Sequence, residues 1–114
     1  MQNTVENLLS SGALRIEPLA QTQLRGDQQL TLLRVEVAPG VQEPTHTHPG
    51  IELLYGLAGQ GYVELGGERK PLSAGTVVTV ERETVKALTS EGDTPMVVLA
   101  ILVLATGKLP FTPI

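Results

Sequence analysis

The sequence features that indicate both the fold and the candidate site of this chain lie in residues 40–59, GVQEPTHTHPGIELLYGLAG. The 114 residues contain only two histidines, and these stand two apart at His46 and His48, with Glu52 four residues later. Alternate side chains of a strand face the same side, so His46 and His48 are predicted to point together. Pro49 and Gly50 suit a bend, which lets Glu52 return to that side at the start of the next strand.

Two imidazoles and one carboxylate that converge match a facial metal site with positions open for water or substrate. We therefore expect one divalent metal ion (Fe, Ni, Mn or Zn) held by His46, His48 and Glu52. An isolated His-x-His pair is more often a surface coincidence than a ligand pair. The residues that flank this pair favour the metal-site interpretation.

Outward from this stretch, short apolar segments alternate with turn residues, a pattern typical of all-β sandwiches and barrels. Gly66-Gly67 predicts a tight hairpin, because two glycines tolerate the positive φ angles of a primed turn. One short N-terminal helix is predicted, with Asn3-x-x-Glu6 as a capping box and Gly12 as its end. The predicted strands are Ala13–Leu19, Leu30–Val37, Gln42–His46, Ile51–Leu57, Gly61–Leu65, Glu68–Leu72, Thr76–Val80, Thr84–Thr89 and Met96–Leu104.

The stretch from Gly40 to Gly59 resembles the first cupin motif, G-x5-H-x-H-x3-E-x6-G, at all five defining positions. The resemblance covers about Leu30 to Leu104. It implies a double-stranded β-helix (jelly-roll) barrel with a short N-terminal helix, a homodimer, and His46, His48 and Glu52 as metal ligands. We expect a single barrel domain over residues 1–114, with an N-terminal helix or arm at 1–12 and a C-terminal arm at 107–114 that packs on its own barrel or on a partner subunit.

The second cupin motif, G-x5-P-x-G-x2-H-x3-N, is badly eroded. Aligned from Gly75, its proline, glycine, histidine and asparagine places hold Glu81, Glu83, Lys86 and Ser90. Lys86 thus stands at the third histidine. Four outcomes are open. In the first, Lys86 pairs with Glu52 and fills the metal position; in the second, it lies to one side and leaves a metal with three ligands. In the third, burial lowers its pKa and makes it a neutral base or nucleophile; in the fourth, it extends out of the barrel mouth.

Composition excludes several classes of function. Cysteine is absent, so disulfides and thiolate chemistry are excluded, in agreement with a cytoplasmic location. The net charge is −4 and the basic residues are scattered, so neither nucleic acid nor a membrane is an expected partner. The longest apolar run, Met96–Ala105, is too short for a membrane helix and fits a buried strand.

Three functions remain open. The first is a metal-dependent enzyme of dioxygenase, isomerase or lyase type acting on a small organic molecule, with Leu54, Val77 and Leu88 as apolar wall and Lys86 as a candidate catalytic residue. The second is a non-catalytic binding or sensory protein with a metal-free pocket, where Lys86 pairs with Glu52 and the ligand is a small anion or sugar. The third is a purely structural or sensory dimer with a filled barrel. The homodimer itself agrees with the predicted edge strand Ala13–Leu19, which a partner chain could cover.

Overall fold

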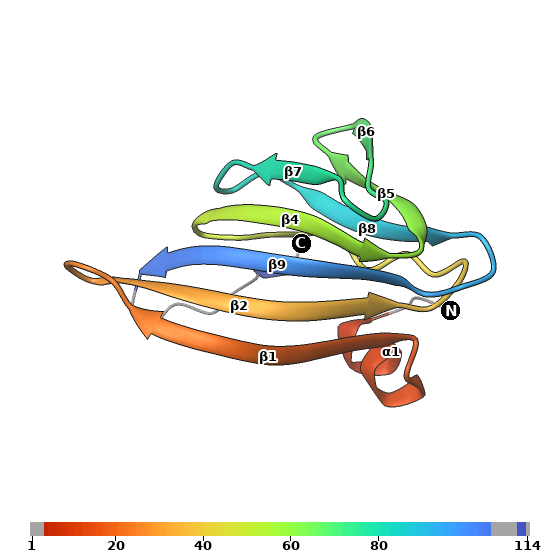
Figure 1. Cartoon of the computed structure of the whole chain (residues 1–114), viewed down its shortest axis with the longest axis horizontal. Coiled ribbons are helices and arrows are strands. Elements are labelled where there is room, and N and C mark those ends of the chain that lie inside the picture. Colours follow the sequence, from red (N-terminus) through yellow and green to blue (C-terminus); the bar gives the residue numbers. More distant parts are fainter. Residues whose placement is uncertain (1–3, 106–111, 114) are drawn as a thin grey trace.

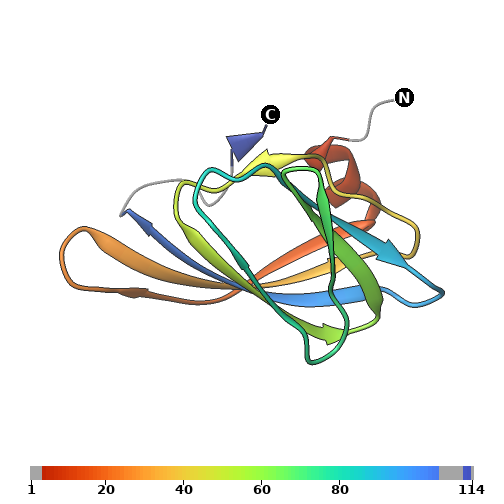
Figure 2. The ribbon, with the colours of Figure 1, turned by 90° about the horizontal axis from the view of Figure 1, so that it is seen from above.

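The computed structural model describes residues 4–105 and 112–113, whose strands form two five-stranded antiparallel sheets. The sheets face one another as the two walls of a jelly-roll barrel, so the all-β prediction is confirmed (Figures 1 and 2). The first sheet has the order β1 (Leu14–Gln23), β2 (Gln28–Val37), β9 (Met96–Ala105), β4 (Ile51–Ala58) and β7 (Val77–Val80). The second has the order β10 (Thr112–Pro113), β3 (His46–Thr47), β8 (Lys86–Glu91), β5 (Gln60–Leu65) and β6 (Glu68–Pro71).

The core lies between the two sheets and is made by alternate residues of each strand. In β9 the inward side chains are Met96, Val98, Ala100, Leu102 and Leu104, all buried. The intervening residues of β9 are also apolar, so the strand is a continuous hydrophobic run rather than an alternating one. Such runs are typical of strands that are covered on both faces.

The helix α1 (Val5–Ser11) lies beside β1 and buries Leu8 in the core. The capping prediction was wrong in its position: the N-cap is Thr4, whose side-chain oxygen accepts a hydrogen bond from the Asn7 backbone N–H at 3.1 Å. Asn3 lies outside the described residues. Gly12 ends the helix at φ 79, as predicted. No helix in the described part of the chain has the length and apolar character needed to cross a membrane.

Most strand predictions agree with the structure to within two residues, but two do not. The predicted strand Gln42–His46 is reduced to an isolated bridge between Gln42 and Thr89 followed by the two-residue β3. Strand β1 runs on beyond Leu19, because a register shift between Pro18 and Ala20 lets the ladder with β2 continue. Most of the predicted C-terminal arm lies outside the described residues; its described part, β10, pairs with β3.

Two of the turns with positive φ angles bear on the predicted hairpin and on the site. Gly66 and Gly67 have φ of 55 and 95 between the paired residues Leu65 and Glu68, which confirms the predicted hairpin of β5 and β6. Glu83 has φ 60 and is the only non-glycine residue with positive φ in the described chain. Its backbone N–H donates to the His48 carbonyl at 2.8 Å, so this turn ties the approach to β8 to the loop after β3.

We expect Glu83→Gly to be at least as stable as the wild type and more stable than Glu83→Ala by about 1 kcal/mol. A side chain at positive φ costs roughly 1–2 kcal/mol, whereas glycine adopts this conformation freely at an entropic cost of about 0.5–1 kcal/mol. Urea denaturation of the three proteins measures the difference. Equal stability of the glycine and alanine variants would show that the turn is not strained.

Candidate functional site

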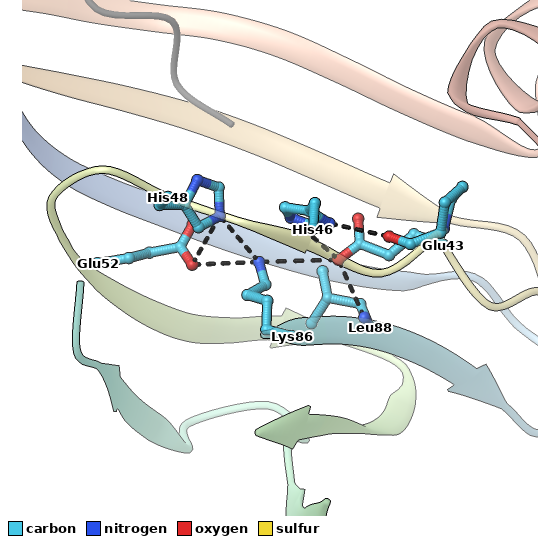
Figure 3. Close-up of polar contacts among 7 residues, drawn as sticks. Glu43, His46, His48, Glu52, Lys86 and Leu88 are labelled. Carbon is cyan, nitrogen blue, oxygen red and sulfur yellow. Dashed lines mark hydrogen bonds and ion pairs between the residues drawn. The ribbon is translucent and has the colours of Figure 1, made fainter. Parts of the chain in front are cut away.

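Three strands deliver polar side chains to one end of the barrel interior, as Figure 3 shows. His46 lies on β3, Glu52 on β4 and Lys86 on β8, and His48 follows β3 directly. His46 and Lys86 are direct cross-strand partners. The bend at Gly50 must be glycine, because a Cβ atom there would collide with the Val103 carbonyl oxygen.

Lys86 is buried at the centre of this cluster, with only 3% of its surface exposed. Its Nζ lies 3.1 Å from Glu52 Oε1, 3.5 Å from His48 Nε2 and 3.7 Å from Glu43 Oε1. The ammonium therefore does not extend out of the barrel mouth. Of the four outcomes for Lys86, the observed one is pairing with Glu52.

Glu43 is a member of the cluster that the sequence reasoning missed. Its Oε1 accepts a hydrogen bond from the Leu88 backbone N–H at 2.9 Å and lies 3.8 Å from His46 Nε2. His46 Nδ1 lies 2.9 Å from the Pro44 carbonyl oxygen, which can only accept. This contact places the ring proton on Nδ1 and leaves the Nε2 lone pair of a neutral His46 facing the cluster.

Burial is the largest influence on each perturbed pKa, and the charges of the cluster decide the outcome for two groups. Burial alone would raise the pKa of Glu52, but the Lys86 ammonium and the His48 contacts outweigh it and lower the pKa from 4.5 to about 2. Burial alone would lower the pKa of Lys86, but Glu52 and Glu43 raise it above 10.5. Burial lowers the pKa of His46 below 6.5. Lys86 is thus a charged ammonium rather than the neutral amine of the third outcome.

The cluster forms the polar end of a small cavity of about 40 Å³. Its other walls are mainly apolar and include Ile16, Leu54 and Leu88, two of which were predicted to line it. The third predicted wall residue, Val77, was wrong: it is 57% exposed on the outer face of the first sheet. Neighbouring residues of β7 point to opposite faces of the sheet, so a register error of one residue moves Val77 from the cavity wall to the outer face. The sequence alone does not fix this register.

Comparison with known proteins identifies the family of this chain. A model of the cupin domain matches residues 33–102. The chain belongs to the cupin family. No curated protein matches its sequence.

Solved structures share the barrel at low identity. A cupin-2 domain from Rhodospirillum rubrum is similar over 90% of this chain and 66% of its own, with 19% identity and a TM-score of 0.72. KdgF from a Halomonas species is similar over 80% and 79%, with 21% identity and a TM-score of 0.67. A salicylate 1,2-dioxygenase from Pseudaminobacter salicylatoxidans is similar over 83% of this cupin and 29% of its own chain, with 18% identity and a TM-score of 0.68.

The donor set does not fit a divalent metal while Lys86 keeps its position. The structure does bring His46, His48 and Glu52 together, with His48 Nε2 and Glu52 Oε1 3.2 Å apart. A metal ion bonded to His48 Nε2 and Glu52 Oε1 at about 2.0–2.2 Å would lie beside the Lys86 ammonium, which contacts the same two atoms. At about 4 Å, the repulsion between a divalent cation and the ammonium would be on the order of 8 kcal/mol. Across residues 4–105 and 112–113, no group of three or more His, Cys, Asp or Glu side chains is arranged to hold a metal ion. The ligand assignment therefore stays a prediction that requires Lys86 to move.

We expect Lys86→Met to destabilise the cupin by about 3–5 kcal/mol, because it leaves Glu52 and Glu43 buried without their cation. Adding Glu52→Gln to Lys86→Met should recover part of this loss. Urea denaturation of the single and double variants gives the coupling between the two residues.

Lys70→Met is the matched control. Lys70 Nζ lies 3.7 Å from Glu68 Oε2, but both side chains are at least half exposed, so its loss should stay within about 1 kcal/mol. Equal losses in the Lys86 and Lys70 variants would contradict a structural role for the buried cluster.

Proposed function

We propose that this cupin binds a small organic ligand in its barrel without a metal ion, and that Lys86 supplies the positive charge of the pocket. The observation that carries the proposal is the contact of Lys86 Nζ with Glu52 Oε1 at 3.1 Å inside a buried cluster. A lysine at the third histidine place that stayed solvated would leave the metal position free. This lysine instead neutralises the carboxylate that a metal would need.

The charges of the pocket favour a neutral ligand over an anion. Two carboxyl groups, Glu43 and Glu52, flank the single ammonium of Lys86. A carboxylate ligand would meet both acidic groups within the same few ångströms, and their repulsion is only weakly screened in a buried site. The small anion expected from sequence therefore loses support, since that expectation did not include Glu43.

The hydrogen bonding and size of the pocket favour a short hydroxyl-bearing molecule. Glu52 Oε1 is buried and lies 3.1 Å from Lys86 Nζ and 3.2 Å from His48 Nε2. A ligand hydroxyl can both donate and accept a hydrogen bond at the polar end of the cavity, where Glu43 and His46 lie, and the apolar walls suit an aliphatic body. A cavity of about 40 Å³ holds on the order of three water-sized groups. Short aliphatic alcohols have these properties.

We expect wild-type protein isolated without chelator to carry well under one metal ion per chain, and Lys86→His to bind close to one. The substitution removes the ammonium and places a third imidazole across from His46. Elemental analysis after reconstitution with iron, nickel, manganese or zinc measures both. Lys70→His on the exposed strand β6 is the matched control and should not gain metal. Near-stoichiometric metal in the wild type would reject the proposal in favour of a metal-dependent enzyme.

We expect short alcohols to bind more tightly than carboxylates of the same chain length, for example 1-propanol over propanoate. Chemical-shift titration of ¹⁵N-labelled protein measures the two affinities. Ile16→Trp fills the cavity wall and should weaken alcohol binding, whereas Arg15→Trp, on the exposed side of the same strand, should not. A preference for the carboxylate, or no response at residues of the pocket, would refute this ligand class.

A further inference from the structure

A second hollow lies beside the cavity on the inner face of the first sheet. Its volume is about 450 Å³, compared with about 40 Å³ for the cavity. Strands β1, β2 and β9 supply its walls, and none of the described residues that line it carries a charge. We call it the side hollow; its lining includes the apolar residues Leu19, Leu33 and Leu104 and the polar residues Gln21, Gln29 and Thr31.

The side hollow and the cavity meet at Leu33, whose side chain lines both. Leu33 and Thr31 alternate along β2 with Val35, which packs in the core, so all three point to the inner face of the sheet. The two spaces are therefore neighbours on one face, with a single leucine between them.

The strand register places the side hollow in line with the polar cluster. Glu52 pairs with Leu102, Leu102 pairs with Thr31, and Thr31 pairs with Gln21. Paired residues point to the same face, and neighbouring strands lie about 4.8 Å apart, so the backbones of Glu52 and Thr31 are about 10 Å apart across the sheet. A short aliphatic chain can span this separation.

The chemistry of the side hollow suits an uncharged polar group at the end of an apolar chain. The amide groups of Gln21 and Gln29 and the hydroxyl group of Thr31 can each donate and accept hydrogen bonds. An ion that left water for this space would meet no opposite charge in its described lining, which is costly. An alcohol or an amide would meet hydrogen-bonding partners instead.

We propose that the ligand of this cupin occupies both spaces. One hydroxyl group lies at the polar end of the cavity, an aliphatic chain passes Leu33, and a second uncharged polar group forms hydrogen bonds with Thr31 and Gln29 in the side hollow. This inference rests on the proposed function, which supplies the first hydroxyl group. It extends the ligand class to unbranched molecules with an uncharged polar group at each end, such as α,ω-diols.

The first test compares 1,6-hexanediol with 1-hexanol by chemical-shift titration of the wild type, Thr31→Val and Thr22→Val. Thr31→Val removes one hydrogen-bonding group, so we expect it to lower the preference for the diol over the monoalcohol by about three- to tenfold. Thr22→Val is the matched control. Thr22 is exposed on β1 and pairs with Leu30 on the opposite face, so the preference should not change.

The second test uses the wild type alone and follows the side-chain amide signals of its glutamines. We expect 1,6-hexanediol to shift the signals of Gln21 and Gln29, whereas 1-propanol, which fits within the cavity, should not. Gln28 is the control, because it is exposed and points away from the side hollow.

The outcomes separate this inference from the proposed function. Binding of 1-propanol at the cavity, together with an unchanged diol preference in Thr31→Val or equal shifts at Gln28 and Gln29, would overturn the inference and leave the proposed function intact. If 1-propanol produces no response at the cavity, the proposed function fails and the two-space ligand fails with it.

Discussion

The arrangement of the candidate site depends on one buried ammonium that lies between two carboxyl groups. Charges removed from water are costly unless they are paired with good geometry, so Lys86, Glu52 and Glu43 constrain one another's positions. They come from β8, β4 and the segment before β3, and their contacts are satisfied only when these elements keep their register. Two backbone hydrogen bonds fix the same register, from the Glu43 N–H to the Leu88 carbonyl and from the Glu83 N–H to the His48 carbonyl. The Glu43 side chain adds a third contact by accepting from the Leu88 N–H.

Much of the fold could be predicted because its signals are local. Gly66-Gly67 adopts the positive φ angles that a primed turn demands, and Gly12 ends the helix in the left-handed region. The errors arose where tertiary pairing overrides local preference. Pro18 and Leu19 look like the end of a strand, yet a bulge carries β1 on to Gln23 because β2 offers a partner for the whole length. Gln42 to Thr45 has only one bridging partner, and Glu43 and Pro44 are residues that strands disfavour.

The candidate site was predicted in part for the same reason. His46, His48 and Glu52 lie close in sequence, so period-two geometry and one turn were enough to bring them together. Motif spacing predicted that Lys86 stands at the third histidine place. Whether its ammonium pairs inside the barrel or extends outwards depends on the carboxyl groups of Glu43 and Glu52 around it. Glu43 is 45 residues from Leu88 and occupies a variable place of the motif, so no spacing rule identifies it. Period-two alternation from His46 would in fact place residue 43 on the opposite side, and Glu43 turns inward only because residues 42–45 do not form a regular strand.

The apolar outer face and the polar pocket are linked through shared strands. In β4, Glu52 and Leu54 point into the barrel while Ile51 and Leu53 point to the outer face. In β9, Ala100 lines the cavity, and the adjacent Ile101, the cross-strand partner of Leu53, points to the outer face. Protein interiors transmit displacement because they are closely packed, so a displacement of β4 at its outer face would also move Glu52 relative to Lys86. β9 is hydrophobic along its length because its inward residues pack in the core and its outward residues lie on the apolar outer face.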